Sequence, residues 1–483
     1  MLNTLKHYSL DALLDYIANY STKLFGSEPI EINSLTIMYG RIPVPFQFLI
    51  TAWELTDLSY YAVTNTSDKR ESRITLDNFR KIINEYKKYT NDRDEQMLES
   101  IKQELAPLYL IYSITQKQLW YQEPYICFEM FNRNYEMMII NSKQIGSNID
   151  FENIVKKQIG MSIEKYINIS ILLFGIGINN VDITTILFEP TILNAFKVSE
   201  QDVRNYREYY SASYDEIRNS ELNENILFTK PIVKTNSGKY IIANSFLLLK
   251  VLSDGLYWIV RNYYLTLGQQ DFINEFGLYF EKYAENLFNN CLSKETFYNI
   301  DTSGTKKKAD WILEIDDYII IIEQKSMLPS LKIKQQYPDI NSLLKYIEKY
   351  EEAFDQLNST EDYIKTSKHR GKTIFKFVLH YDILYNAEFI KDHLVRKRNN
   401  QDDKNIYFIN IGELERLIYL LKIDKSNLSK VLSEKVKREE QQVIQKSLEF
   451  NGIISDLFPG YNNPYVEEFK NHLYEYRDKL NKK

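Results

Sequence analysis

Hydrophobic positions in the first half of the chain recur at the spacing of amphipathic helices. Leucine, isoleucine, phenylalanine and tyrosine return every three or four residues in Ser9–Tyr20, Leu76–Tyr89, Met97–Leu119 and Phe151–Phe174. Polar breaks separate these segments near residues 64–73, 142–148 and 209–223. The pattern predicts a mostly helical region over residues 1–225, without a phosphate-binding glycine loop and without an internal repeat.

The pattern changes after this region. Two runs of alternating residues flank Asn236-Ser237-Gly238, which predicts a β-hairpin within Lys230–Asn244. A helical pattern, Ser245–Leu265, follows it directly. We therefore predict a connector of a hairpin and a helix over residues 226–267.

Residues 268–425 alternate between helical and strand patterns, which is typical of helices packed on a mixed sheet. Helices are expected at Asp271–Asn290, Ser342–Leu357 and Glu413–Leu421, and strands at Phe297–Ile300, Thr373–Leu379 and Asn405–Ile411. Residues 426–483 return to a helical, charged pattern and predict a C-terminal extension. The expected fold class is α+β with several domains.

The segment Lys307–Ser326 contains the candidate residues of a functional site. It predicts two strands joined at Asp316–Asp317, and the second strand is almost wholly apolar until it reaches Glu323 and Lys325. Because side chains alternate along a strand, these two share a face while Gln324 points away. A charged pair at the end of an isoleucine run is costly unless it meets a partner or an ion. The segment therefore predicts the edge of a metal site.

Two carboxylates and a lysine on adjacent strands suit metal-assisted hydrolysis of a phosphodiester. Asp310 and Glu323 supply hard oxygen ligands for Mg²⁺, with Mn²⁺ as an alternative, and the carbonyl of Gln324 adds a third contact. The metal would activate a bound water, which Lys325 would orient or from which it would accept a proton. Glu281, one helical turn after Gly277, can reach inward and complete the metal shell. The expected catalytic residues are Asp310, Glu323, Lys325 and Glu281, and the expected metal ligands are Asp310, Glu323, Gln324 and Glu281.

These residues resemble the motif of the PD-(D/E)XK nuclease superfamily, the restriction-endonuclease-like fold. Glu281 in FGLYFEKY, Asp310 in KKADW and Glu323-Gln324-Lys325 in IIIIEQKS follow one another in the order of that motif. Ala309 stands where the motif has the proline that names it, which removes no ligand.

The resemblance covers about residues 268–425. It implies a mixed central sheet with flanking helices, in the order helix, strand hairpin, helix, strand. It also implies Mg²⁺-dependent cleavage, usually of DNA. Some relatives carry a glutamine that lines the site on the helix after the hairpin, where this chain has Gln356; a solvent-facing residue is an equal alternative.

Charge and composition restrict the possible partners. Nucleic-acid-binding proteins usually carry an excess of positive charge, whereas the net charge of this chain is −6. Any contact with a nucleic acid must therefore use local basic patches. One candidate patch is Lys306–Lys308 with Lys332 and Lys334, and another is His393–Arg398; a solvated surface is the favoured alternative for both. His380 is expected to be structural. The two cysteines, Cys127 and Cys291, favour neither a disulfide framework nor a zinc site.

The chain has no sequence signal for export or for a membrane. Asp11 and Asp15 interrupt the N-terminal apolar pattern, and the longest apolar run, Ile169–Ile178, is about half the length of a membrane span. We expect a cytoplasmic protein.

The leading hypothesis is a Mg²⁺-dependent endonuclease acting on DNA, an effector of bacterial phage defence or restriction by analogy of layout. The helical half would control target choice, activation or assembly, as a homo-oligomer or with a separate recognition or ATPase partner. The alternatives are a catalytically inactive nucleic-acid-binding or scaffold protein with the same fold, and a nuclease that acts on RNA.

Overall fold

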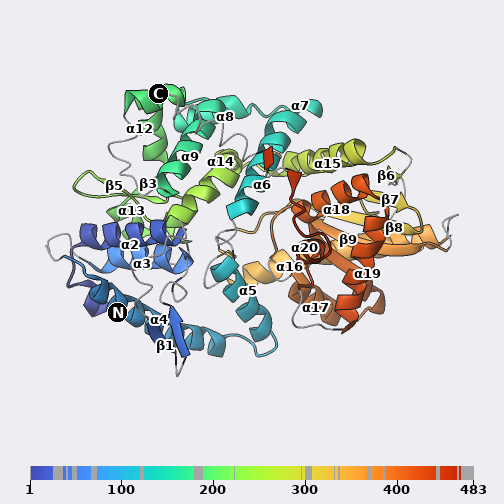
Figure 1. Cartoon of the computed structure of the whole chain (residues 1–483), viewed down its shortest axis with the longest axis horizontal. Coiled ribbons are helices and arrows are strands. Elements are labelled where there is room, and N and C mark those ends of the chain that lie inside the picture. Colours follow the sequence, from blue (N-terminus) through green and yellow to red (C-terminus); the bar gives the residue numbers. More distant parts are fainter. Residues whose placement is uncertain are drawn as a thin grey trace.

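The computed structural model is an α+β protein, as its sequence predicts, with mixed sheets of three and five strands. It describes residues 2–25, 36–39, 42–45, 50, 52–66, 73–119, 124–178, 189–221, 224–294, 296–299, 307–330, 332–334, 338–366, 371–384, 387–441, 447–464 and 467–468. The N-terminal helices lie on one side of the molecule and the five-stranded sheet with its helices on the other (Figure 1). Helices α6 and α14 run between the two parts (Figure 1).

The N-terminal part is mostly helical, as predicted. Its helices are α1 (Leu2–Leu5), α2 (Leu10–Phe25), α3 (Ala52–Asn65), α4 (Leu76–Ser100), α5 (Ala106–Leu119), α6 (Pro124–Tyr135), α7 (Ser142–Gln144), α8 (Phe151–Ile159), α9 (Ile163–Ile178), α11 (Pro190–Ala195), α12 (Glu200–Tyr209) and α13 (Tyr214–Asn219). A π-helical turn, η3 (Glu136–Asn141), joins α6 to α7, and a short 3₁₀ helix, η5 (Ile226–Phe228), follows α13. Strands β1 (Thr36–Tyr39) and β2 (Ile42–Pro45) pair with each other.

Two helices predicted as continuous are broken in the structure. The segment Phe151–Phe174 divides at Gly160, which caps α8 in the left-handed conformation with φ 79°. The segment Met97–Leu119 divides because Ile101 is extended and α5 starts at Ala106, next to Pro107. Proline lacks an amide hydrogen and is tolerated in a first turn but not inside a helix. Hydrophobic spacing alone passes over both interruptions.

The predicted connector has the expected hairpin and helix. Strands β4 (Ile232–Lys234) and β5 (Tyr240–Ile242) are antiparallel, and α14 (Ser245–Thr266) follows. The sequence pattern misses β3 (Ser211–Ser213), which pairs with β4 in parallel within a segment that reads as a polar break. Gly255 lets α14 approach the N-terminal helices closely, since an added Cβ would lie 2.2 Å from the Tyr166 hydroxyl.

The C-terminal part is built on the five-stranded sheet, in the order β10-β9-β8-β7-β6. Its elements are α15 (Asp271–Cys291), β6 (Phe297–Tyr298), β7 (Trp311–Ile315), β8 (Tyr318–Lys325), α16 (Ile340–Thr366), β9 (Thr373–His380), α17 (Ala387–Arg398), η6 (Gln401–Asn405), β10 (Ile406–Asn410), α18 (Ile411–Ile423), α19 (Ser426–Gln441) and α20 (Phe450–Leu457). Strands β6, β7 and β8 form an antiparallel meander, and β9 and β10 continue the sheet in parallel with β8. The order helix, hairpin, helix, strand is the one that the sequence predicts.

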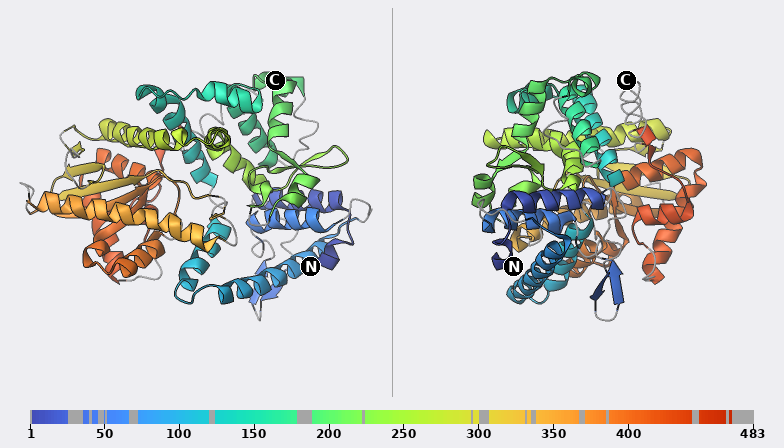
Figure 2. Two further views of the ribbon diagram at one scale, coloured as in Figure 1. Left: turned by 180° about the vertical axis from the view of Figure 1, so that it is seen from behind. Right: turned by 60° about the vertical axis from the view of Figure 1, so that its left-hand side comes forward.

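Helices cover both faces of this sheet. Alternate residues of β8 divide between two cores: Ile320 and Ile322 belong to the cluster with α15 and α18, and Ile319 and Ile321 to the cluster with α16 and α17. Asn410, which ends β10, caps α18 by accepting a hydrogen bond from the Glu413 amide and donating its own amide to the Glu413 carboxylate. The sheet is therefore the middle layer of three (Figure 2).

The largest hydrophobic cluster extends beyond the sheet and its helices. It runs from Phe128 in α6, through α14 and α15, to Ile454 in α20. Phe450 of α20 packs on Phe377 of β9 with ring centroids 5.3 Å apart. Helices α19 and α20, predicted as an extension, thus help to cover the sheet, and α14 ties it to the N-terminal helices.

Candidate active site

The β7–β8 hairpin forms in the register that the sequence suggests. Trp311 pairs with Ile322 and Ile315 with Tyr318, so Asp316 and Asp317 form the two-residue turn. Asp316 adopts a positive φ of 49°, which such tight turns require. At the other end of the hairpin, the Gln324 amide donates a 2.6 Å hydrogen bond to Asp310 Oδ2. The register therefore brings Asp310 beside the end of β8.

Glu323 and Lys325 share a face of β8, as predicted. The Lys325 ammonium donates to Glu323 Oε1 at 2.8 Å and to Gln356 Oε1 of α16 at 3.3 Å. Gln356 in turn donates its Nε2 to the Lys308 carbonyl at 3.3 Å. The sequence left open whether Gln356 lines the site or faces solvent. In the structure it contacts the Lys325 ammonium from α16. We call Glu281, Asp310, Glu323, Lys325 and Gln356 the carboxylate cluster.

Gln324 points to the opposite face of the sheet. Its Oε1 accepts a 2.7 Å hydrogen bond from the Trp311 indole, while its Nε2 is buried without a partner among the described residues. Gln324 Oε1 already accepts the hydrogen bond from Trp311. The predicted contact of Gln324 with a metal would therefore be made by its main-chain carbonyl oxygen. Sequence reasoning missed Trp311 in this role, although its place opposite Ile322 on the hairpin is predictable from the register.

The carboxylates oppose one another electrostatically. Burial, followed by the charge of Asp310, raises the pKa of Glu323 to about 8, and Lys325 offsets part of this rise. Burial also raises the pKa of Asp310, against the hydrogen bond from the Gln324 amide and the charge of Lys325. The pKa of Glu281 is raised by burial and then by Asp310. Asp310 is thus close enough to influence a carboxylate on each side, from α15 and from β8.

The end of the hairpin offers few side-chain ligands for a metal. Among the described residues, no group of three or more His, Cys, Asp or Glu side chains is arranged to hold a metal ion. Mg²⁺ usually takes one or two carboxylates and keeps several waters. No lysine, amide or hydroxyl donor of the described residues reaches the buried Glu323 Oε2, but the Glu323 and Asp310 carboxyls lie in hydrogen-bonding contact with each other. These two adjoining carboxyls fit the prediction of a hard cation at the hairpin end.

The lysines around the motif have different surroundings. Lys308 donates to the carbonyl and hydroxyl of Ser359, and Lys334, 4% exposed, pairs with Asp382 at 2.6 Å. Lys332 pairs with Glu224 at the surface, and Lys307 is exposed. Lys306 lies outside the described residues. Lys308 and Lys334 have structural partners, so among the described lysines of the predicted patch only Lys307 and the surface pair of Lys332 remain at the surface.

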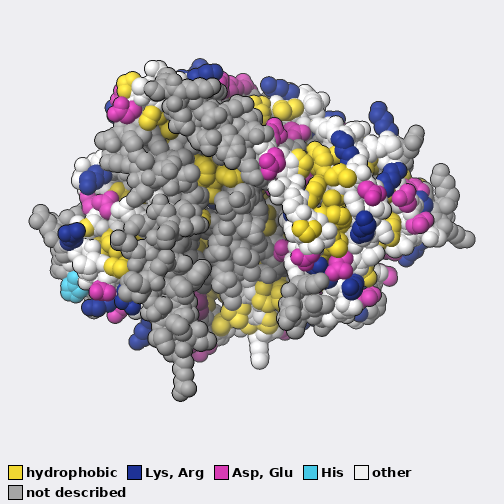
Figure 3. Space-filling view, viewed as in Figure 1, with side chains coloured by type: hydrophobic (Ala, Val, Ile, Leu, Met, Phe, Trp, Pro, Cys, Tyr) yellow, Lys and Arg dark blue, Asp and Glu magenta, His cyan; other side chains and the backbone are white. Residues whose placement is uncertain are grey.

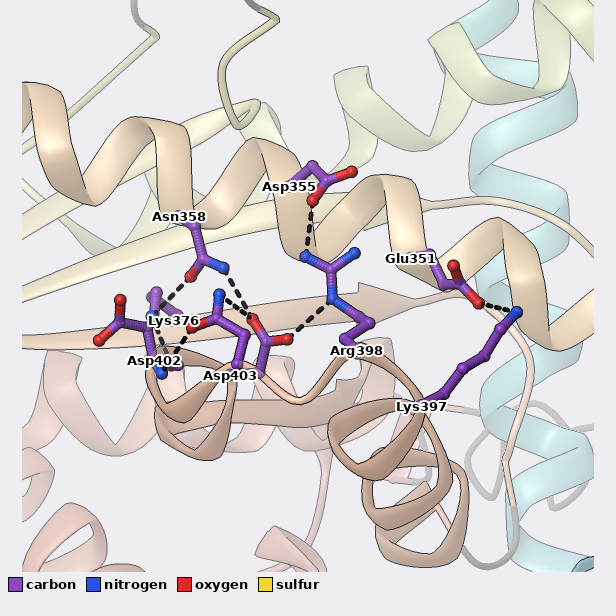
Figure 4. A network of polar contacts seen from close by, with 9 residues as sticks. Glu351, Asp355, Asn358, Lys376, Lys397, Arg398, Asp402 and Asp403 are labelled. Carbon is purple, nitrogen blue, oxygen red and sulfur yellow. Dashed lines mark hydrogen bonds and ion pairs between the residues drawn. The ribbon is translucent and has the colours of Figure 1, made fainter.

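The second predicted patch, His393–Arg398, is largely neutralised. Lys397 pairs with Glu351 of α16 at 2.6 Å, and Arg398 pairs with Asp355 and Asp403 (Figure 4). Arg396 is exposed beside Asp392. Over the described part of the face seen in Figure 3, basic and acidic side chains are interspersed rather than gathered by sign. The described side chains of this face form no large basic surface.

The remaining candidates are structural. His380 is buried, its Nδ1 lies against the Asp382 carbonyl, and burial lowers its pKa to about 4. Cys291 is a free thiol, and the side chain of Cys127 lies outside the described residues.

Within the described ranges, no helix is both long and apolar enough to cross a bilayer.

Comparison with known proteins adds no further constraint. No family model, no curated protein and no solved structure matches this chain. Any functional inference must therefore be carried by the carboxylate cluster and its surroundings.

Proposed function

We propose that the protein is a Mg²⁺-dependent nuclease of PD-(D/E)XK type that hydrolyses phosphodiester bonds, with DNA as its substrate. The observation that carries this proposal is the meeting of Asp310, Glu323 and Lys325 at one end of the β7–β8 hairpin, where the two carboxyls contact each other and Lys325 contacts Glu323. Perturbed carboxylates with a specific charged neighbour are typical of functional sites. The motif order and the order of elements in the sheet support the family assignment.

Each residue of the cluster has a role in this proposal. Asp310 and Glu323 would hold the ion, with the Gln324 carbonyl and Glu281 as further oxygen donors. A bound Mg²⁺ would supply a water of lowered pKa and positive charge for the phosphate. The Lys325 ammonium, 2.8 Å from Glu323, would donate a hydrogen bond to a non-bridging phosphate oxygen. Gln356 keeps that ammonium in place from α16.

The test compares cleavage of plasmid, single-stranded DNA and RNA by purified protein in Mg²⁺, in Mn²⁺ and in EDTA. We expect cleavage of DNA that EDTA abolishes, and a loss of at least about 100-fold in rate for Lys325→Ala and for Asp310→Ala. Circular dichroism and a DNA-binding assay should show that Lys325→Ala leaves the fold and the binding nearly intact.

Matched controls exist at exposed positions of the C-terminal part. Lys425→Ala and Asp317→Ala remove the same charges there and should cleave like the wild type. Metal-dependent cleavage that survives both Lys325→Ala and Asp310→Ala would overturn the site. Binding of DNA without cleavage by the wild type would favour an inactive binding protein.

A further inference from the structure

A large pocket lies between the N-terminal helices and the sheet. Its volume is about 520 Å³, within the usual range for a small-ligand site. One wall is α14 with residues at the ends of α12 and η5, and the other is made by α15, α16 and the segment 326–330 that follows β8. Tyr257 of α14 packs on Phe276 of α15 with ring centroids 4.8 Å apart, which fixes the two walls relative to each other.

The pocket adjoins the carboxylate cluster along three elements. On β8, Lys325 of the cluster is followed directly by Ser326 of the pocket. On α15, Ile273 of the pocket precedes Glu281 by eight residues, about 12 Å along the helix and about 80° around it. On α16, Lys349 precedes Gln356 by seven residues, about 10 Å. A ligand in the pocket would therefore lie beside the candidate catalytic centre.

The lining combines aromatic rings with basic groups. Tyr209, Tyr257 and Trp258 supply flat surfaces, and the Trp258 indole is held by Asp254 at 3.4 Å. Lys250, Arg261, Lys334 and Lys349 also line the pocket, against one acidic residue, Asp254, among its described lining. This local excess of positive charge stands in a chain whose net charge is −6.

Arg261 differs from the lysines of the pocket in its hydrogen bonding. Lys250 pairs with Asp254 at 3.1 Å and Lys334 with Asp382 at 2.6 Å, so both lysines already have carboxylate partners. The buried Nη1 of Arg261, in contrast, has no hydrogen-bond acceptor among the described residues. A buried guanidinium donor without an acceptor is costly and favours an anionic or carbonyl ligand.

Together these features match an unstacked nucleotide: rings for the base and a cation for its phosphate. We propose that the pocket holds one unpaired nucleotide of the substrate strand, adjacent to the bond that is cut. The inference rests on the proposed nuclease function and adds a requirement to it. The enzyme needs a strand that is single, frayed or distorted beside the cleavage position, because a nucleotide stacked within a regular duplex cannot enter the pocket.

The test measures binding in EDTA, so that no cleavage is needed for a readout. A labelled single-stranded DNA oligonucleotide, the same sequence as a full duplex, and free deoxynucleoside monophosphates are titrated with the full chain. We expect the single strand to bind most tightly. Trp258→Ala and Arg261→Gln should each weaken its binding about tenfold. Arg204→Gln, which removes an arginine from an exposed pair with Glu200, should change it less than about twofold.

Several outcomes would overturn the pocket assignment. These are equal losses in Arg261→Gln and Arg204→Gln, a preference for the duplex, or pocket variants that affect free nucleotides but not the single strand. Urea unfolding of each variant confirms that it is folded. If the wild type cleaves DNA while the pocket variants bind normally, the pocket proposal fails and the nuclease proposal stands. If the wild type never cleaves but the pocket variants lose binding, the pocket binds single-stranded DNA and the nuclease proposal fails.

Discussion

Two polar clusters each include a side chain of α16, and they differ in how completely their charges are compensated. In the first, which we call the closed network, Lys376 is 1% exposed and contacts Asn358, the Asp402 carbonyl and Glu361. Its neighbour Arg398 bridges Asp355 and Asp403 (Figure 4). Each buried charge in these contacts meets an opposite charge or a hydrogen-bonding group.

The carboxylate cluster is arranged differently. Glu323 has Lys325 on one side and the Asp310 carboxyl on the other, and the charge of Asp310 raises the pKa of both Glu323 and Glu281. Both clusters contain acids, a lysine and an α16 amide, so composition does not separate them. The difference is that one is electrostatically complete and the other accumulates negative charge. Incomplete compensation of this kind is expected where a ligand will supply the missing charge.

The closed network should carry the larger share of stability. Lys376→Ala leaves the Glu361 carboxylate and the Asn358 amide without their buried cation, and should lower the free energy of unfolding by about 3–5 kcal/mol in urea titrations. Lys365→Ala removes another lysine from the same Glu361, but its side chain is 57% exposed, so the loss should stay below about 1 kcal/mol. Equal losses in the two variants would contradict the assignment of Lys376 to a buried structural network.

The carboxylate cluster should respond to pH in the opposite sense to a stabilising ion pair. Because the pKa of Glu323 is raised from 4.5 to about 8 in the folded state, the folded protein binds the proton more tightly than the unfolded chain. In EDTA, stability should therefore fall by a few kcal/mol as the pH rises between these values. Glu323→Gln should remove most of this fall, while Glu352→Gln, at an exposed site on α16, should not. A pH profile that is unchanged in Glu323→Gln would argue against the raised pKa.

Mg²⁺ should reverse that destabilisation. At a concentration ten times its Kd, a cation that binds only the folded chain stabilises it by about 1.4 kcal/mol. The effect should be larger at pH 8 than at pH 5, because the ion competes with the proton on Glu323. Differential scanning fluorimetry with MgCl₂ and with EDTA measures it. Stabilisation that persists in Asp310→Ala would place the cation elsewhere.

The smallest effect is expected at Gln356. Gln356→Ala removes one hydrogen bond to Lys325, worth about 1 kcal/mol, so cleavage should slow about fivefold with little change in substrate binding. Gln356→Glu should restore part of the rate, because a carboxylate also accepts from the ammonium. A drop of the same size in Glu352→Gln would show that any change on α16 slows the reaction.

The sequence was most informative where one local pattern determines the geometry. The isoleucine run with its two-residue turn predicts the β7–β8 register, and the register places Asp310, Glu323 and Lys325. Gln356 was undecided because helical spacing does not give the rotation of α16 against the sheet. The structural roles of Lys334 and Arg398 were also out of reach, since their partners Asp382, Asp355 and Asp403 come close only through tertiary packing.

The same limit explains the pocket and the broken helices. Arg261 and Trp258 belong to a helical run in the sequence, and only the packing of α14 against α15 shows that they face a cavity. Gly160 and Pro107 were visible as residues, but hydrophobic periodicity continues across them. Attention to these two residue types would have divided both helices correctly.

The two-residue turn at Asp316–Asp317 has a consequence for how this chain can vary. Surface loops commonly accept insertions, and this turn is exposed. Here one added residue in β8 would shift the pairing with β7 by one position and exchange the faces of the isoleucines. It would also move Glu323 and Lys325 to the side of the sheet away from α16, about 20 Å from the inserted residue. Geometry thus constrains the length of β8 directly after this turn, and a deletion or insertion scan should find residues 318–325 far less tolerant than exposed loops of the protein.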